Sequence, residues 1–173
     1  MDTPESIILI GMPGAGKSTI GILLAKEVGL DFLDTDVAIQ VREGKTLQEI
    51  MDASNYLKLR HIEEQVLLAT DCRGKVVATG GSAVYSEAGM IHLRNQGVIV
   101  YLDVPLAELI HRIHNFEERG IARHPNQSFS DLYEERCRLY HKYADLTIHC
   151  DRLSAQEIVT QVISQLPATT PDR

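Results

Sequence analysis

The sequence predicts a three-layer α/β fold in which helices cover both faces of a central parallel sheet. Short runs of β-branched residues alternate along the chain with longer stretches of helical periodicity, which is the pattern of β-α-β units. A glycine-rich segment joins the first such run to the first helical stretch. The chain has 173 residues, of which 44% are hydrophobic, so we expect one domain over residues 1–173 with a buried core.

The first half of the chain is predicted to form two strands and several helices. Residues 6–10 are a short apolar run typical of a buried strand, and a second strand covers residues 31–33. Thr46 and Glu49 have the spacing of a capping box, in which each side chain satisfies a free backbone amide at a helix start. Helices are expected at residues 17–28, 37–43, 47–52 and 56–70.

The second half is predicted to add the remaining strands and a final helix. The strands fit three apolar runs, residues 75–78, 98–102 and 146–150. Ser154 and Glu157 form a second capping box, which starts a helix ending near residue 166. The polar stretch at about 114–127 is interpreted as a flexible lid, with a plain surface loop as the alternative. The tail at 167–173 has no apolar anchor and is expected to fray.

Charge and cysteine content narrow the classes of partner. The net charge is −7 and the pI is about 5.4, so the surface does not attract nucleic acid or anionic lipid, and we expect neither as a partner. The three cysteines lack metal-ligand spacing, and the acidic N-terminus lacks the basic and apolar regions of a signal peptide. These features favour a cytoplasmic protein that binds small molecules, and we expect it to be a monomer.

Residues 11–19 match the pattern G-x-x-x-x-G-K-[ST] at every fixed position. The motif lies between a predicted strand and a predicted helix, where backbone N–H groups and a helix N-terminus can surround a phosphate. Lys17 is expected to reach the β- and γ-phosphates, and the Ser18 hydroxyl to ligate Mg²⁺. The alternative is a glycine-rich turn that binds nothing. We predict that the nucleotide is bound by Gly14, Ala15, Gly16, Lys17, Ser18 and Thr19.

Two aspartates, Asp34 and Asp36, follow the second predicted strand, at the end of the sheet where parallel α/β folds bind ligands. Strand alternation would place both side chains on one side. One carboxylate can then hold hydrated Mg²⁺ while the other accepts a hydroxyl proton. An Asx turn with a helix N-cap is the alternative. Asp103 is interpreted as a strand-end turn residue rather than a metal-binding aspartate, and the sequence has no N-K-x-D guanine signature.

Further short motifs follow the glycine-rich segment in a fixed order. They are LDTD at 33–36, LR at 59–60 with Glu63, TGG at 79–81, LDVP at 102–105 and Arg136 within ERCRLY at 135–140. In this order and spacing the chain resembles the shikimate kinase family along nearly its whole length. The resemblance implies a five-stranded parallel sheet similar to that of nucleoside monophosphate kinases. It also implies transfer of the γ-phosphate of ATP, with Mg²⁺, to a hydroxyl of a small carboxylated metabolite.

The resemblance assigns roles to residues beside the phosphate loop. Asp34 would enter the Mg²⁺ shell, and Asp36 would bind the acceptor hydroxyl as the catalytic base. The backbone of Gly80 and Gly81 would lie against the acceptor, because glycine permits close approach. A plain strand-end turn is the alternative for these two glycines.

The resemblance implies that Arg60 and Arg136 hold the acceptor carboxylate through their planar guanidinium groups. Glu63 lies three residues after Arg60 on one helical face and is expected to orient it. A surface ion pair is the alternative for Arg60 and Glu63, and a solvated run of charges is the alternative for Arg136.

The resemblance assigns three more arginines to the nucleotide. Arg119 has the spacing of the family's lid arginine and would close over the phosphates during transfer. Arg123 is the alternative for that role. Arg152, after the last strand, has the position at which the family places an arginine against adenine.

The chain departs from the family pattern around the acceptor pocket. Ser82 replaces the third glycine of a Gly-Gly-Gly segment, and RGIA at 119–122 replaces Arg-Pro-Leu-Leu in a slightly shorter lid. Met51 and Leu59 replace two phenylalanines, and NY at 55–56 replaces Gly-Glu. These departures bear on the acceptor more than on phosphoryl transfer.

We therefore expect a kinase that acts on shikimate. Gluconate or another polyol acid is the alternative acceptor, and an ATP-binding module without a productive acceptor is the alternative class. An adenylate kinase fits less well, because its phosphate loop has Gly-Lys-Gly-Thr where this chain has GKST at 16–19.

Overall fold

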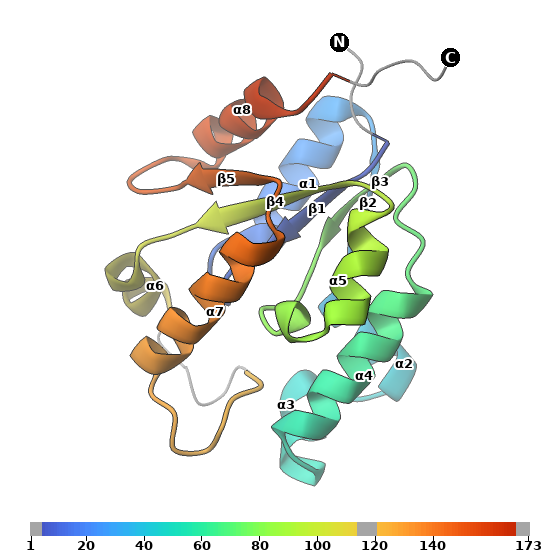
Figure 1. Cartoon of the computed structure of the whole chain (residues 1–173), viewed down its shortest axis with the longest axis vertical. Coiled ribbons are helices and arrows are strands. Elements are labelled where there is room, and N and C mark those ends of the chain that lie inside the picture. The colour runs from blue at the N-terminus through green and yellow to red at the C-terminus, as the bar shows by residue number, and fades with distance from the viewer. Residues whose placement is uncertain (1–4, 114–120, 169–173) are drawn as a thin grey trace.

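The computed structural model describes residues 5–113 and 121–168, and its centre is a parallel sheet of five strands (Figure 1). The strands are β1 (Ile7–Ile10), β2 (Asp31–Asp34), β3 (Lys75–Ala78), β4 (Val98–Asp103) and β5 (Leu146–His149). They pair in parallel in the order β2-β3-β1-β4-β5, with Ile8 opposite both Val77 and Ile99. The expected five-stranded parallel sheet is confirmed, with each strand within about one residue of its predicted range.

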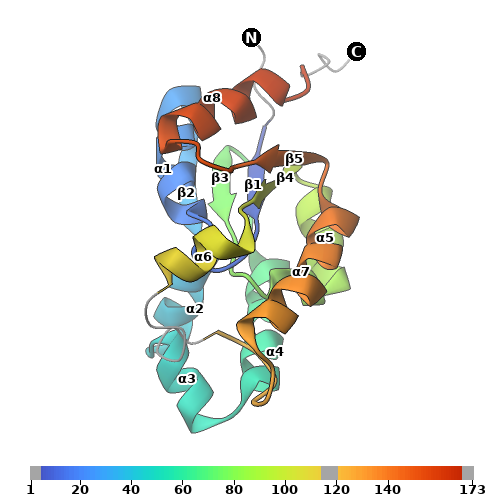
Figure 2. The ribbon, with the colours of Figure 1, turned by 90° about the vertical axis from the view of Figure 1, so that its left-hand side faces the viewer.

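Helices form a layer on each face of the sheet (Figure 2). On one face lie α1 (Lys17–Val28) and α8 (Ala155–Gln165), and on the other α5 (Glu87–Arg94) and α7 (Phe129–Tyr143). The end of the molecule opposite α8 holds α2 (Thr35–Glu43), α3 (Leu47–Ala53) and α4 (Tyr56–Ala69) (Figure 1). The expected three-layer arrangement is therefore confirmed.

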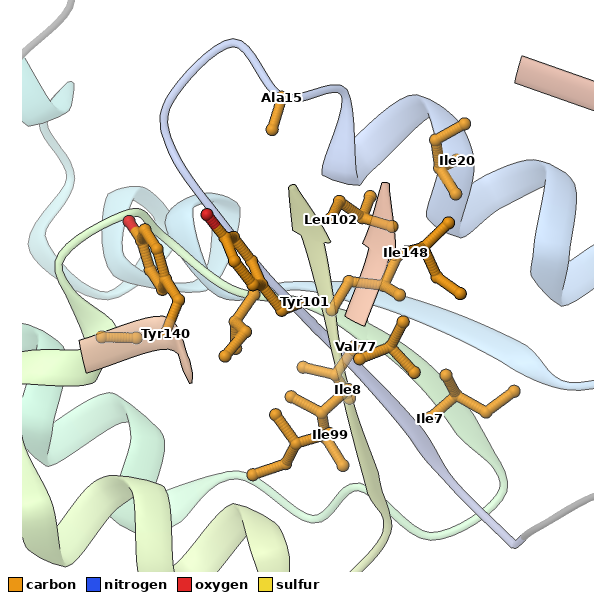
Figure 3. Packing of buried hydrophobic residues seen from close by; sticks show 14 of the residues in the cluster. Ile7, Ile8, Ala15, Ile20, Val77, Ile99, Tyr101, Leu102, Tyr140 and Ile148 are labelled. Atoms are coloured by element: carbon orange, nitrogen blue, oxygen red, sulfur yellow. The ribbon is translucent and has the colours of Figure 1, made fainter. Parts of the chain in front are cut away.

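Two apolar clusters hold these layers together. The larger one surrounds β1, whose four side chains have no exposed surface, as expected for the central strand of a sheet covered on both faces. Figure 3 shows Ile7, Ile8 and Ile99 packed within this cluster. The smaller cluster joins α2, α3 and α4 and contains Ile39, Ile50, Leu59, Ile62, Val66 and Ala122. This second cluster fixes the helices that carry the acceptor side of the cavity described below.

Some of the helices and helix caps agree with those predicted from the sequence. The predicted capping boxes at Thr46 and Ser154 are confirmed, and a third, formed by Ser128 and Asp131, starts α7. The sequence analysis did not predict α5, α7 or the short 3₁₀ helix η1 (Ala83–Tyr85). In α7 a charged residue, Arg136, occupies one of the buried positions, beside Leu132, Tyr140 and Tyr143.

Parts of the predicted lid and tail lie outside the described residues. These are residues 114–120, which include Arg119, and residues 169–173. Within the ranges that are described, no helix combines the length and the apolar character needed to cross a membrane.

Candidate active site

A cavity of about 290 Å³ lies beside the glycine-rich loop that follows β1. The chain leaves β1 toward β2 on one side of the sheet, whereas it leaves the neighbouring β4 toward β5 on the other side. This edge of the sheet is therefore a topological switch point, where α/β folds bind ligands. The volume is near the lower end of the range for small-molecule sites. The charged lining residues are Lys17, Asp36, Glu63 and Arg136.

The phosphate loop has the expected backbone. β1 leads into it, and α1 begins directly after it at Lys17. Gly14 and Gly16 have φ angles of 82° and 91°, in the left-handed region that favours glycine. Gly16 is the N-cap of α1 and has no side chain to occupy the free N–H groups of the first turn. The N-terminus of α1 is therefore available to an anion.

The side chain of Lys17 is folded back onto its own loop. Its Nζ donates to the carbonyl oxygens of Gly11 at 2.7 Å and Met12 at 2.8 Å, and the residue is only 8% exposed. Burial lowers the pKa of Lys17 to about 8, against the opposing effect of Asp36. A phosphate group entering the loop would supply the negative charge that this buried ammonium group lacks.

Asp34 makes two kinds of contact. Its Oδ1 accepts the backbone N–H groups of Asp36 at 2.9 Å and Val37 at 3.3 Å, so it is the N-cap of α2. Its Oδ2 accepts the hydroxyl of Ser18 at 2.5 Å. Asp34 therefore caps α2, as the alternative interpretation predicted, and it also contacts the phosphate loop through Ser18.

The strand alternation predicted for Asp34 and Asp36 is wrong. β2 ends at Asp34 and α2 begins at Thr35, so the two aspartates do not belong to one strand. Instead Asp36 lies in the first turn of α2 and lines the cavity, whereas Asp34 faces Ser18.

The Ser18 and Asp34 oxygens fit a magnesium site. Both are hard oxygen ligands, and Mg²⁺ usually takes one or two protein oxygens and completes its shell with water and substrate phosphates. Over residues 5–113 and 121–168, no group of three or more His, Cys, Asp or Glu side chains forms a metal cage. The donor set therefore suits a metal that arrives with the nucleotide.

Two carboxyl groups converge at Gly80, that of the buried Glu63 and that of the half-buried Asp36. A Cβ atom at this position would lie 2.5 Å from both Asp36 Oδ1 and Glu63 Oε1, so glycine is required for them to meet here. Burial and the neighbouring Asp34 raise the pKa of Asp36 to about 6. Burial and the charge of Asp36 raise the pKa of Glu63 to about 7. Both groups therefore hold protons more tightly than in water.

Arg136 faces these carboxyl groups from α7. It is 1% exposed, and its Nη2 donates to the carbonyl oxygen of Ala122 at 2.6 Å. The Nε of Arg136 is buried without a hydrogen-bond partner among the described atoms. The alternative of a solvated charge run is therefore excluded for this residue. Its neighbour Gly81, whose carbonyl oxygen accepts the Tyr140 hydroxyl at 2.6 Å, also lines the cavity.

Arg60 and Glu63 do not form the expected pair. Glu63 accepts a hydrogen bond from the Ser82 hydroxyl, and Arg60 lies instead against the ring of Tyr85, with its Cζ 3.6 Å from the ring centroid. Arg60 borders a smaller pocket of about 160 Å³, next to the main cavity, that Glu63 and Ser82 also line. The prediction that Glu63 orients Arg60 is wrong, because Ser82 binds the glutamate and Tyr85 contacts the arginine.

One arginine at the phosphate loop was not assigned from the sequence. Arg112 ends α6 (Leu106–Arg112), donates to the Gly14 carbonyl oxygen at 3.2 Å and forms an ion pair with Glu108. In the sequence, Arg112 serves only as the reference point for the spacing of Arg119, which lies outside the described residues. Arg123, the alternative to Arg119, donates to the Gln127 carbonyl oxygen at 2.7 Å.

Two further candidates lie at the ends of β4 and β5. Asp103 accepts from the Tyr101 hydroxyl at 3.2 Å and contacts His149 Nδ1 at 3.0 Å, which agrees with a strand-end role. Arg152 is exposed, in the turn after β5, with a φ of 56° that is uncommon outside glycine. Its contact with adenine stays a prediction.

The residues that depart from the family pattern line the cavities or cap a nearby helix. Leu59 lines the main cavity, whereas Met51 lines an adjoining cavity with Tyr56 and Arg123. Asn55 caps α4 by accepting the Lys58 N–H at 2.9 Å. The apolar wall of the main cavity is formed by Ile39, Leu47, Leu59 and Ile121.

The buried carboxyl group of Glu63 predicts a pH dependence of stability. Its folded pKa of about 7 exceeds the ordinary 4.5, so its contribution to stability is complete below pH 4.5 and is lost as the pH rises through 7. The charges facing it are Asp36, Arg136 and Lys17. Glu63→Gln cannot ionise and is expected to raise Tm at pH 8 by several degrees, at about 2–4 °C per kcal/mol.

Thermal unfolding at pH 5 and pH 8, without ligands, measures this effect. At pH 5 the variant and the wild type should differ little. Glu27→Gln, which removes an exposed carboxyl group from α1, is the control and should not change the pH profile. A Glu63→Gln variant whose Tm difference from wild type is the same at both pH values would contradict the account.

The fold and this site define a phosphotransferase with a phosphate loop and a small-metabolite pocket beside it. The family model for shikimate kinase matches residues 13–167. The shikimate kinase of Haemophilus influenzae (strain PittEE) is 34% identical over 94% of this chain and 93% of its own. That of Alteromonas mediterranea is 36% identical over 96% and 99%. The chain belongs to the shikimate kinase family, and it is an ATP-dependent kinase with a hydroxyl acceptor.

Solved structures agree with this assignment. The shikimate kinase from Acinetobacter baumannii in complex with shikimate has a TM-score of 0.81 and 29% identity, covering 92% of this chain and 91% of that one. The shikimate kinase from Aquifex aeolicus has a TM-score of 0.77 and 28% identity, covering 91% and 94%. The expected kinase fold is therefore confirmed.

Proposed function

We propose that the protein transfers the γ-phosphate of ATP to the 3-hydroxyl of shikimate. The observation that carries this proposal is the buried Arg136, which faces Asp36 in one cavity beside the phosphate loop. A buried guanidinium group whose Nε has no partner among the described residues is suited to a carboxylate, and Asp36 is suited to a hydroxyl. An acceptor that carries both groups at the right separation meets both residues at once.

Asp36 acts as the base in this proposal. Its carboxylate accepts the proton of the acceptor hydroxyl as that oxygen attacks the γ-phosphorus, and its raised pKa makes it a better proton acceptor than an exposed aspartate. Glu63 lies on the other side of Gly80, where burial and the charge of Asp36 raise its pKa to about 7. Gly80 and Gly81 form the wall against which the acceptor lies.

Lys17 and the loop backbone hold the phosphates. The Lys17 ammonium group leaves the Gly11 and Met12 carbonyl oxygens to bind the β- and γ-phosphates, and the N–H groups from Gly14 to Thr19 surround them. Ser18 and Asp34 would hold Mg²⁺, which when bound neutralises charge on the phosphates. We also propose Arg119 for closure over the phosphates and Arg152 for contact with adenine.

We further propose that the protein works in the cytoplasm as a monomer. Cys72, Cys137 and Cys150 are free thiols in the structure, which suits a reducing compartment. The acidic surface gives nucleic acid and anionic membranes no electrostatic attraction.

Substitution of the two arginines tests the acceptor site. Arg60→Ala and Arg136→Ala are expected to raise the KM for shikimate about 10- to 150-fold, because each removes a charge-assisted contact worth ~1.5–3 kcal/mol. The KM for ATP should change much less. Lysine at either position should restore only part of the loss, since a point charge cannot make a bidentate contact.

Two controls accompany this measurement. Arg138→Ala removes an exposed arginine from the same helix as Arg136 and should leave the KM for shikimate unchanged. An acceptor analogue without the carboxylate should be a poor substrate whose KM hardly responds to either arginine substitution. If both alanine variants retain the wild-type KM for shikimate, these arginines do not bind the acceptor.

A further inference from the structure

Tyr85 contacts both arginines assigned to the acceptor carboxylate. It ends η1, a few residues after Gly80 and Gly81. The centroid of its ring lies 3.6 Å from Arg60 Cζ and 5.5 Å from Arg136 Cζ. Its hydroxyl donates to Glu135 Oε1 at 2.5 Å, which fixes the plane of the ring from α7. One aromatic side chain therefore links α4, η1 and α7 at the smaller pocket next to the main cavity.

The contact between Tyr85 and Arg60 uses the ring face. A cation over the face of an aromatic ring is attracted by its negative quadrupole, and this leaves the N–H donors at the edge of the guanidinium plane available. An ion pair with Glu63 would occupy some of those donors. Tyr56 adds a second aromatic ring, whose centroid lies 5.0 Å from Arg60 Cζ.

Each of the two arginines keeps one buried donor that no described residue satisfies. Within the part of the chain that the structure describes, Nε of Arg60 and Nε of Arg136 are buried without a hydrogen-bond partner. Buried polar groups of this kind are rare unless a ligand or water satisfies them. Glu63 does not reach them, because Ser82 holds one of its oxygens and the other faces Asp36 across Gly80.

We propose that Tyr85 is the positioning residue of the acceptor site, holding Arg60 by its face so that the free edges of Arg60 and Arg136 meet one acceptor carboxylate. The inference rests on the proposed function, because it names the residue that organises the same carboxylate site. The spacing of Arg60 and Glu63 predicted that the glutamate orients Arg60, and in this proposal Tyr85 orients it instead. Ser82, which replaces a family glycine, donates a hydrogen bond to Glu63 and so holds this glutamate away from Arg60.

Kinetics of Tyr85 variants test the role. Tyr85→Leu keeps an apolar side chain but loses the ring, and is expected to raise the KM for shikimate about tenfold, with kcat and the KM for ATP within about twofold of wild type. Tyr85→Phe keeps the ring and should stay within about threefold for all three constants. Tyr133→Leu, which removes a partly buried tyrosine of α7, is the matched control and should leave the KM for shikimate unchanged.

The NMR signal of the Arg60 Nε–Hε group provides a readout that does not depend on turnover. It is assigned by its loss in Arg60→Lys. The ring current of Tyr85 should displace this signal upfield in wild type and in Tyr85→Phe. Most of the displacement should be lost in Tyr85→Leu, where only the more distant Tyr56 ring remains. An undisplaced signal in the wild-type protein would overturn the proposal even if the leucine variant failed to fold.

The outcomes separate this inference from the proposed function. If wild type phosphorylates shikimate and its KM depends on Arg136 but not on the Tyr85 ring, the positioning role fails and the proposed function stands. If wild type does not phosphorylate shikimate, the proposed function fails, and the Arg60 signal alone still decides whether Tyr85 holds this arginine.

Discussion

Asp36→Asn is expected to lower kcat by about 10²- to 10⁴-fold, the usual contribution of a positioned general base. Asparagine keeps the shape of the side chain in the first turn of α2 but cannot accept the proton of the acceptor hydroxyl. The KM for ATP should change little, because Asp36 lines the cavity on the acceptor side of the phosphate loop. Steady-state kinetics with shikimate and ATP measure the effect.

Comparison with Asp34→Asn separates the roles of the two aspartates. Asp34 contacts Ser18, so its substitution should raise the Mg²⁺ concentration needed for half-maximal rate, whereas Asp36→Asn should leave that concentration unchanged. Asp31→Asn removes an exposed carboxylate at the start of β2 and serves as the control for both. An identical Mg²⁺ dependence in Asp34→Asn and Asp36→Asn would contradict this division.

Lys17→Ala is expected to lower kcat/KM for ATP by at least about 10²- to 10³-fold, the loss seen when one preorganised electrostatic donor is removed from a reacting group. The phosphate loop should keep its shape, because left-handed glycines and the start of α1 form it from the backbone. Far-ultraviolet circular dichroism and thermal unfolding check that the variant is folded.

Lys26→Ala is the matched control for Lys17→Ala. It removes an exposed lysine from the last turn of the same helix, far along α1 from the loop, and should leave both kinetic constants unchanged. A Lys17→Ala variant with wild-type kcat/KM would mean that the glycine-rich loop does not bind the transferred phosphate.

The strands and the phosphate loop could be predicted because their signals are local. β1 is a continuous apolar run, as the central strand of a covered parallel sheet must be, and the loop motif is fixed by the backbone geometry that phosphate requires. The capping boxes at Thr46 and Ser154 are equally local. In contrast, α7 was not predicted, although its buried positions Leu132, Arg136, Tyr140 and Tyr143 follow helical spacing.

The partners of the site residues could not be predicted from spacing. Residues three apart on a helix lie near each other, but their side chains turn to the stronger partner, and here Ser82 and Tyr85 come from the segment after β3. The contact of Arg112 with the Gly14 carbonyl oxygen joins residues 98 positions apart and left no signal in the sequence. Convergence at Gly80 likewise depends on how α2 and α4 pack against each other beside the segment that follows β3.

The most direct test of the account is ADP release measured in a coupled assay with shikimate, with gluconate, with AMP and with no acceptor. We expect rapid ADP release with shikimate, a rate near the acceptor-free background with gluconate and AMP, and loss of the shikimate-dependent rate at low shikimate in Arg136→Ala. Rapid release with gluconate and none with shikimate would contradict the assigned acceptor. A rate that is the same with and without every acceptor would contradict the kinase site itself.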